Sequence, residues 1–301
     1  GRMAQLDKTF PTDDCSMCIM SPKLVEVGRH RNIELITSST VKEVKGEKGA
    51  FEVRVSQKAR YVDMSKCIAC GMCAEKCPKK VDDLFNGGLI KRKAVYIQYP
   101  QAVPLKYVIN KDNCIYLQNG KCGACQKFCP AGAINFEDMD KELSFNVGAI
   151  ILSPGFKAYD PSPDDRLGYS ATPDIMTSLE FERILSASGP TMGHLVRMSD
   201  NKEPEKIAWI QCVGSRNINN CDNFYCSSVC CMYTIKQAII AKEHSPSPLD
   251  CAIFYMDMRT HGKGFEECFN SARDNHGVRF ERARIHTVTK DTDGRLRITY
   301  P

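Results

Sequence analysis

Over the first 60 residues, apolar positions recur in short stretches that are typical of strands. Phe51–Val55 alternates as Phe-Glu-Val-Arg-Val, and a period of two residues buries one face of a strand. Ile33–Thr37 and Val41–Val44 are shorter apolar stretches for which we also expect strands. Strand character returns at Leu143–Leu152, which ends in the turn-forming Ser153-Pro154-Gly155. The pattern therefore predicts β-structure on both sides of a different central region.

After Lys206 the pattern changes to strands that alternate with helices. A strand, a turn, a helix and a second strand form the opening of a dinucleotide-binding fold. The first turn reads Cys212-Val213-Gly214-Ser215, however, and the chain contains no Gly-x-Gly-x-x-Gly fingerprint, which argues against an NAD(P)H-linked enzyme. We expect strands at Ile207–Cys212, Ala252–Met256 and within Val278–Val288, and helices at Leu179–Ser186, Val229–His244 and Phe265–Asn275.

The central region holds two runs of four cysteines, each of which closes with a cysteine followed by proline. This spacing is typical of ferredoxins that bind two [4Fe–4S] clusters, in which the last cysteine of each run binds the other cluster. Zinc and disulfides are the alternatives, and zinc spacing is a poor match. We therefore expect transfer of single electrons. The predicted ligand sets are Cys67, Cys70, Cys73 with Cys129, and Cys114, Cys122, Cys125 with Cys77.

A further concentration of cysteines follows the strand at 207–212. The start of the next helix would hold a phosphate in an ordinary dinucleotide-binding fold, and the same field favours thiolates. We predict a third [4Fe–4S] cluster there, with structural or free thiols as the alternative. Its ligands would be Cys212, Cys226, Cys230 and Cys231.

Three other cysteines and one cysteine pair have less definite roles. Cys221 stays unassigned, whereas Cys251 and Cys268 lie in strand and helix patterns, as buried thiols do. Cys15-x2-Cys18 can provide only half of a cluster. It is therefore either a redox-active or structural pair, or half of a shared or incomplete fourth cluster.

Composition and charge narrow the class of protein. The 301 residues suggest two domains, and 17 cysteines indicate metal binding, because a secreted disulfide scaffold is normally short and opens with a signal peptide. No apolar run approaches the ~18 residues of a membrane span, so we expect a cytoplasmic protein. The net charge of +5 does not indicate nucleic-acid binding, since lysines and arginines are scattered and two clusters of about −2 each nearly cancel it. The six histidines form no catalytic or metal pattern.

Several segments together resemble one family, the A subunit of heterodisulfide reductase. This iron–sulfur flavoprotein occurs in methanogens and in many anaerobic bacteria. The resemblance covers essentially the whole chain, and its Cys-Cys-Met-Tyr and Gln-Cys-Val-Gly-Ser-Arg segments are quite specific. The segments are Gly1–Met3, Leu6–Pro11, Cys15–Cys18, Arg60–Asp63, Gln211–Arg216, Cys230–Tyr233 and Phe254–Asp257.

The resemblance implies an α/β fold, a thioredoxin-reductase-like flavoprotein with an inserted two-cluster ferredoxin-like α+β domain. It also supports the third cluster and a cluster role for Cys15 and Cys18. Family members begin with a glycine-rich FAD fingerprint that is absent here, so we expect an internal fragment of a longer protein. The implied parts are 1–60 of an FAD-binding domain, the ferredoxin domain 61–137, a return to the FAD-binding domain at 138–160, a loop region 161–205 and a second dinucleotide-fold-like domain 206–301.

In such a family FAD splits electron pairs, and the clusters relay single electrons to ferredoxin and to a disulfide-reducing partner. The implied partners are other heterodisulfide reductase subunits, a hydrogenase or formate dehydrogenase subunit that supplies electrons, and ferredoxin. Lys236 lies five residues after Cys231 and could stabilise reduced flavin, although a solvated surface charge is the alternative. The implied flavin contacts are Arg2, Lys8, Thr9, Ser153, Pro154 and Gly155.

Two other functions compete with this hypothesis. The quinone-interacting oxidoreductase of sulfate reducers, which works beside a membrane subunit, shares the architecture. By contrast, a flavin-free polyferredoxin would be a carrier and no enzyme. The flavin spectrum of the intact protein separates the first two functions from the third, and neighbouring genes would separate the first from the second.

Overall fold

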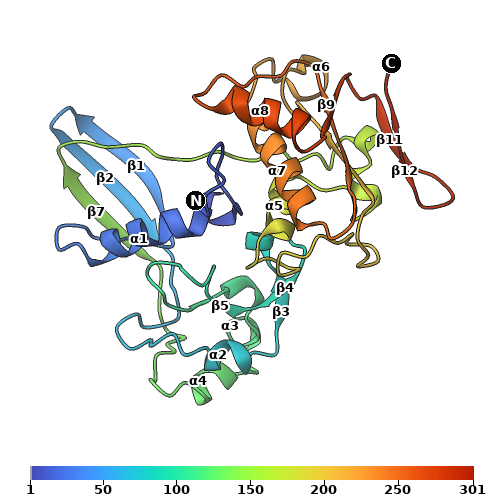
Figure 1. Cartoon of the computed structure of the whole chain (residues 1–301). Helices are drawn as coiled ribbons and strands as arrows, with labels where there is room; N and C mark the ends of the chain where they lie inside the picture. The colour runs from blue at the N-terminus through green and yellow to red at the C-terminus, as the bar shows by residue number, and fades with distance from the viewer. Residues whose placement is uncertain (1) are drawn as a thin grey trace. The chain divides into compact units, whose positions relative to one another are not determined.

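The computed structural model describes residues 2–301, so that Gly1, which belongs to the resemblance, lies outside the described residues. The chain forms two compact units with mixed α/β structure (Figure 1). One unit joins the N-terminal segment up to Cys18 to Phe156–Pro301, and the other spans Ile19–Gly155. The five-part division expected from the sequence stays a prediction.

An antiparallel sheet of three strands belongs to the unit Ile19–Gly155, which also contains most of the helix α1 (Ser16–Arg29). The strand β2 (Ala50–Gln57) lies in the middle and pairs with β1 (Ser39–Glu47) on one side and with β7 (Lys141–Val147) on the other. The alternating stretch at 51–55 lies inside β2 and buries Val55. The strands predicted at Val41–Val44 and Phe51–Val55 are therefore confirmed.

One strand prediction in this unit is wrong, and another is confirmed only in part. Ile33–Thr37 is not a strand, because its backbone is held by a turn and by side chains: Gln57 and Ser39 both donate to the carbonyl oxygen of Thr37. The stretch Leu143–Leu152 is a strand only as far as Val147, which pairs with Phe51 at the start of β2. Beyond that pair the partner strand has ended, and the side chain of Ile151 is 92 % exposed.

The cysteine runs lie in short elements between β2 and β7. Their helices are α2 (Met72–Glu75), α3 (Ile115–Asn119) and α4 (Ala124–Lys127), with 3₁₀ turns at Leu84–Asn86 and Lys111–Asn113. Their strands form two antiparallel pairs, β3 (Lys80–Asp82) with β4 (Lys91–Lys93) and β5 (Val95–Tyr96) with β6 (Val108–Ile109).

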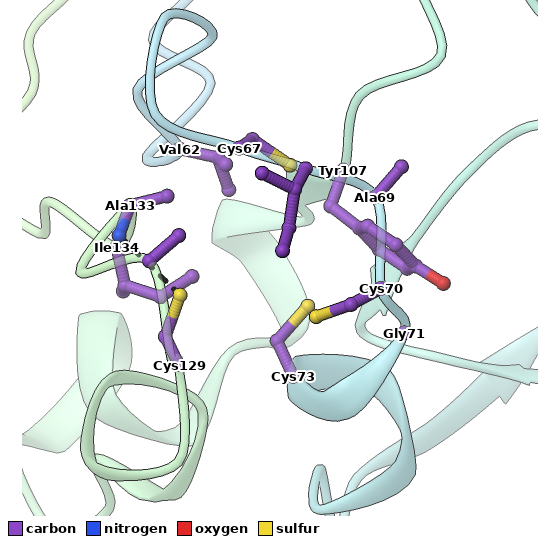
Figure 2. A pocket seen from close by; sticks show the side chains of 12 residues that line it. Val62, Cys67, Ala69, Cys70, Gly71, Cys73, Tyr107, Cys129, Ala133 and Ile134 are labelled. Atoms are coloured by element: carbon purple, nitrogen blue, oxygen red, sulfur yellow. Dashed lines mark hydrogen bonds between the residues drawn. The ribbon is translucent and has the colours of Figure 1, made fainter.

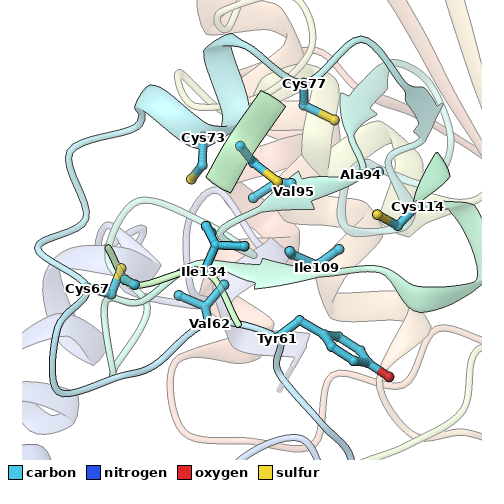
Figure 3. Packing of buried hydrophobic residues seen from close by; sticks show 12 residues of the cluster. Tyr61, Val62, Cys67, Cys73, Cys77, Ala94, Val95, Ile109, Cys114 and Ile134 are labelled. Carbon is cyan, nitrogen blue, oxygen red and sulfur yellow. The ribbon is translucent and has the colours of Figure 1, made fainter. Parts of the chain in front are cut away.

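The buried core of this region contains an unusual share of sulfur (Figure 3). Five of its twelve buried residues are cysteines: Cys67, Cys73, Cys77, Cys114 and Cys125. The start and the end of the region are tied together, since Val62 bridges to Ile134 and a carboxylate oxygen of Asp138 accepts the backbone N–H groups of Arg60 (3.0 Å) and Tyr61 (3.1 Å). The fully buried part of this core contains few large apolar side chains, and partly buried residues such as Tyr107, Tyr116 and Phe136 pack against it.

The other unit is built around a parallel sheet in the order β10-β9-β8. Going outward from β8, the strands occur in the sequence order expected of the first half of a dinucleotide-binding fold. The strands are β8 (Lys206–Ile210), β9 (Asp250–Tyr255) and β10 (Arg279–Arg282), and the helices are α5 (Ser178–Leu185), α6 (Ile218–Cys221), α7 (Cys230–His244) and α8 (Phe265–Asp274). A hairpin of β11 (Thr287–Lys290) and β12 (Leu296–Thr299) follows, and 3₁₀ turns occur at Arg2–Gln5, Asp165–Leu167 and Tyr169–Ala171.

These elements confirm the strands and helices predicted after Lys206, and most of the predicted ends lie within two residues of the observed ends. They also confirm the helix predicted at 179–186. Helix α7 packs against α5, α8 and β9, which explains why eleven of its fifteen residues are buried. Trp209, the single tryptophan of the chain, lies in β8 and contacts Phe181 edge to face. No helix among residues 2–301 is long and apolar enough to cross a membrane.

Candidate metal centres

The first cysteine pocket is formed by both runs. Cys67, Cys70 and Cys73 come from the loop that leads into α2, and Cys129 comes from the segment after α4. Figure 2 shows their four sulfur atoms around a shared space. The wall is mainly apolar, with Tyr107 and Ile134 among its residues.

In the second pocket the two runs again combine, but here the second run supplies three cysteines and the first run supplies one. This pocket is lined by Cys114, Cys122 and Cys125 of the second run together with Cys77 of the first. The structure thus brings together the same two sets of four cysteines that the spacing predicts. Their role as iron ligands stays a prediction.

Glycine makes the tight cysteine loops possible. Gly71 and Gly123 each lie between two of the cysteines and immediately before a short helix, with φ angles of 89° and 146°. An L side chain rarely adopts these values, so that glycine is needed for the loop to turn three thiols toward one space. After the second run, the backbone N–H of Ala133 donates to the sulfur of Cys129 (3.3 Å). A thiolate accepts hydrogen bonds and cannot donate them, so this N–H donor suits an ionised Cys129.

Burial favours the neutral form of the thiols in both pockets. Burial raises the pKa of Cys73 to about 12 and that of Cys125 to about 11, and neighbouring cysteines add to both shifts. Iron would favour the thiolates, because ligation needs the deprotonated form. Among residues 2–301, no three His, Cys, Asp or Glu side chains converge on a single ion position. A [4Fe–4S] cluster needs a wider arrangement, since each thiolate binds a different iron.

The third cysteine group lies where the parallel sheet meets the start of α7. Cys212 follows β8 in a left-handed conformation, with φ 60°, and Cys230 and Cys231 form the first turn of the helix, where both are buried. The thiol of Cys230 hydrogen-bonds with those of Cys212 and Cys231. Cys226 is close enough to act electrostatically on Cys212. The structure therefore brings the four predicted residues together, whereas their role as cluster ligands remains a prediction.

The ionisation of these thiols is linked. Hydrogen bonds from Cys212 and Cys231 lower the pKa of Cys230, and the same bonds together with burial raise the pKa values of Cys212 and Cys231. The donor set fits a cationic iron–sulfur group that would allow all of them to ionise.

Arg216 brings a cation to this third group. Its Nη2 pairs with Asp257 (2.7 Å), and the guanidinium also contacts Cys212. Its Nη1 is buried without a hydrogen-bond partner among the described residues. Spacing alone gave no reason to select Arg216, because its contact with Cys212 depends on the turn between them.

The turn after Cys212 has one conformational requirement. Gly214 has a φ of 74°, and a Cβ built there would lie 2.1 Å from the ring of Tyr159. Both the backbone and the close contact with the ring therefore demand glycine. Gly214 occupies the place of the phosphate-binding glycines in an ordinary dinucleotide-binding turn, but here it supports a cysteine.

The remaining cysteines lie apart from these groups. Cys15 and Cys18 form an exposed disulfide with a Cα–Cα distance of 5.2 Å, so an iron site there would require reduction of this bond and stays a prediction. Cys251 is buried in β9, as predicted, and burial raises its pKa to about 12. Cys268 is only partly buried, and the thiol of Cys221 donates to the carbonyl oxygen of Asn217 (3.1 Å).

Lys236 is not a solvated surface charge, so that this alternative is wrong. Its side chain is 1 % exposed, and its Nζ contacts Glu182 Oε1 (2.5 Å) and the carbonyl oxygen of Lys8 (2.8 Å). Glu182 also accepts from the backbone N–H of Asp7 (2.9 Å) and from the amide of Gln237 (2.8 Å). The network fixes the N-terminal segment onto α5 and α7. Nothing in the local pattern marks Glu182, whose role depends on a contact across 54 positions of the sequence.

The residues expected near a flavin are divided between the two units. Arg2, Lys8 and Thr9 lie in the N-terminal segment, where Arg2 contacts Gln5 (2.9 Å), Lys8 pairs with Glu243 (3.5 Å) and Thr9 contacts Asp14. Ser153, Pro154 and Gly155 lie in an exposed segment of the other unit. Their part in flavin binding, like that of Lys236, remains a prediction.

The amino-acid sequence is similar to those of known iron–sulfur proteins. A family model described as a 4Fe-4S binding domain matches residues 60–81, which include the whole first cysteine run. The chain is 45 % identical over 293 residues to the A subunit of the H(2):CoB-CoM heterodisulfide,ferredoxin reductase of Methanothermobacter thermautotrophicus, a match that covers 97 % of the chain and 43 % of that protein.

Two further relatives have similar names. The iron-sulfur A subunit of the CoB–CoM heterodisulfide reductase of Methanocaldococcus jannaschii is 45 % identical over 97 % of the chain and 44 % of its own length. The A subunit of the Ferredoxin:CoB-CoM heterodisulfide reductase of Methanosarcina mazei is 39 % identical over 100 % of the chain and 37 % of its own length. The chain thus spans less than half the length of these relatives. Over nearly all of its own length, it belongs to the family of heterodisulfide reductase A subunits and corresponds to a part of them.

Proposed function

We propose that the chain is the iron–sulfur electron-transfer part of a flavoprotein subunit in a heterodisulfide reductase-type complex. The observation that carries this proposal is the exchange of the last cysteines between two pockets, each lined by four cysteines. [4Fe–4S] clusters would provide transfer of single electrons there, over a range of potentials that depends on their surroundings. The protein's contribution is to hold four thiols at fixed positions and to limit access of water, because every cysteine of the two sets except Cys70 is buried or partly buried.

The third cysteine group is proposed as an additional electron site. Support comes from the contacts among Cys212, Cys230 and Cys231, from the nearby Cys226, and from the guanidinium of Arg216 beside Cys212. The group occupies the start of α7, where the free N–H groups and the helix dipole favour negative charge. Arg216 and the helix start would together stabilise the thiolates.

The proposed fold of the complete subunit is thioredoxin-reductase-like and binds FAD, which would exchange electron pairs while the clusters carry single electrons. The relatives' names connect this family to heterodisulfide and, in two of the three described, to ferredoxin. As partners we propose ferredoxin, other reductase subunits and an electron-supplying subunit of a hydrogenase or formate dehydrogenase. Within the chain, the buried Lys236–Glu182 pair would fix the N-terminal segment that carries Arg2, Lys8 and Thr9.

The test uses the full-length protein, purified or reconstituted without oxygen. We expect a flavin absorption spectrum together with iron and sulfide in the chain's three proposed sites, about twelve iron atoms beyond those bound elsewhere in the protein. Replacement of Cys212 and Cys230 by alanine should remove about four of them. A protein with iron but no flavin would favour a polyferredoxin carrier, and a count that the Cys212 and Cys230 substitutions do not change would remove the third site.

A further inference from the structure

Two lysines make the same contact, one at each ferredoxin-type pocket. Nζ of Lys106 lies 2.5 Å from the carbonyl oxygen of Cys67, and Nζ of Lys93 lies 2.5 Å from the carbonyl oxygen of Cys77. Cys67 lines the first pocket and Cys77 lines the second. Each pocket therefore has an ammonium group held at the backbone of one of its own cysteines, and Lys79 also lines the second pocket.

The chain around each lysine confirms that the charge lies close to its pocket. Tyr107, the residue after Lys106, lines the first pocket. Ala94 and Val95, the residues after Lys93, line the second. Lys93 is the last residue of β4, and Lys106 lies in the irregular segment two positions before β6 begins. Each contact with a carbonyl oxygen is partly buried.

Neither ammonium is neutralised by an acidic neighbour. Among residues 2–301, no carboxylate lies within 4.0 Å of Nζ of Lys93 or Lys106. Other lysines of the same region are paired: Lys66 with Asp63 (3.8 Å), Lys76 with Glu75 (2.8 Å) and Lys91 with Asp82 (2.6 Å). A carbonyl oxygen accepts a hydrogen bond but cancels no net charge, so that the two contacts leave a full positive charge beside each pocket.

A positive charge at this place has a defined effect on electron uptake. A cluster held by four thiolates gains one negative charge when it is reduced, and the potential of such a cluster depends on its net charge, on hydrogen bonds and on exposure. In a partly buried site the effective dielectric constant is lower than in bulk water, so a unit charge beside the pocket acts more strongly than an exposed one. The ammonium therefore stabilises the reduced form more than the oxidised form.

We propose that Lys106 and Lys93 each raise the reduction potential of one cluster, Lys106 at the pocket lined by Cys67 and Lys93 at the pocket lined by Cys77. The two lysines then act as separate electrostatic controls on two neighbouring electron sites. This inference rests on the proposed function, since it requires a cluster in each pocket. It assigns the lysines no direct contact with iron or sulfide.

The test is a redox titration of the full-length, cluster-loaded protein, followed by electron paramagnetic resonance. Lys106→Met and Lys93→Met remove the charge and keep the length of the side chain. Each is expected to lower the reduction equilibrium constant of one cluster about tenfold, which equals about 59 mV for a one-electron couple. The two variants must shift different signals. Lys91→Met, which removes an exposed and paired charge, is the matched control and should shift neither.

Two further variants separate charge from hydrogen bonding. Lys106→Arg and Lys93→Arg keep the charge and should retain the unsubstituted potentials. Lys106→Gln and Lys93→Gln keep a donor without charge and should lower them, and they decide the question if a methionine variant loses iron. Unchanged potentials in the glutamine variants, or equal shifts of both signals by one substitution, would overturn the proposal. The iron content of the unsubstituted protein tests the proposed function separately, since fewer than two clusters in this region would end that proposal whatever the lysines do.

Discussion

The ferredoxin-type region and the region around Cys212 hold cysteines in opposite ways. In the first, short helices and two-residue strands surround a core in which cysteine is the commonest residue. In the second, a parallel sheet and the buried helix α7 form a core of their own, and the cysteines lie at its edge. We therefore expect the fold of the first region to depend on the clusters proposed for it. The second region has an apolar core that does not depend on its cysteines.

Removal of iron should give the largest difference between the two regions. Chelation without oxygen is expected to unfold the ferredoxin-type region, because the thiols of its core lose the group that joins them. The strands β8 and β9 and the helix α7 should keep their structure. Hydrogen exchange read by mass spectrometry checks this, with fast exchange at 61–137 and slow exchange at 206–256 as the expected result. Equal loss of protection in both regions would contradict the comparison.

The exchange of cysteines between pockets can be tested by counting iron. Cys67→Ala with Cys129→Ala should cost about four iron atoms, because both residues line the same pocket. Cys114→Ala with Cys129→Ala should cost about eight, since these residues line different pockets although they belong to one run. Iron and sulfide analysis measures both. The reverse order would show that each run binds its own cluster.

The scaffold around Cys212 should be sensitive to its buried ion pair. Glu182→Gln leaves the ammonium of Lys236 buried without its counter-charge and is expected to lower the free energy of unfolding by about 3–5 kcal/mol. Urea unfolding followed by the fluorescence of Trp209 reports on this unit alone, because the chain contains no other tryptophan. Glu243→Gln, which removes an exposed partner of Lys8, is the control and should change little. Similar losses for both would contradict a buried role for Glu182.

A smaller effect is expected from the turn that follows Cys212. Gly214→Ala combines an unfavourable φ with a clash against the ring of Tyr159, and should cost about 1–3 kcal/mol in the same fluorescence experiment. Gly277→Ala has a similar backbone conformation, with φ 59°, but nothing lies within 4 Å of its added Cβ. The difference between the two variants therefore measures the clash. A cost no larger for Gly214→Ala than for Gly277→Ala would show that Tyr159 yields freely.

The smallest expected effect concerns pH. Burial, followed by the charge of Glu182, raises the pKa of Asp7 above its ordinary value of 3.8. A raised pKa means that the folded state holds the proton more tightly than the unfolded state does, so the cost in stability grows as the pH rises above the ordinary value of 3.8 and is complete above the folded pKa. Asp7→Asn should therefore stabilise the unit at pH 7, by less than about 1 kcal/mol. The gain should shrink as the pH falls towards 3.8, and an equal gain at both pH values would exclude titration as its cause.

Local spacing predicted most of the structure that depends on neighbouring residues. The cysteine spacing anticipated both four-cysteine pockets, because tight loops around glycine have few possible geometries. Periodicity located the strands and helices after Lys206, whose apolar faces are continuous. Periodicity failed at Ile33–Thr37, because a turn and side-chain hydrogen bonds hold this backbone and no neighbouring strand among the described residues pairs with it. It also could not show that Lys236 is buried or that Glu182 is its partner, since both depend on how α5 packs against α7.

The exchanged last cysteines also set an order of assembly. As the chain emerges from the ribosome, the pocket that begins at Cys67 is still missing Cys129 when the other set becomes complete at Cys125. The pocket begun first is thus the last to obtain all of its thiols, and a chain that stops just before Cys129 would hold three open cysteines beside one complete set. With clusters bound as proposed, iron and sulfide would fill the first pocket only after nearly the whole region has been synthesised.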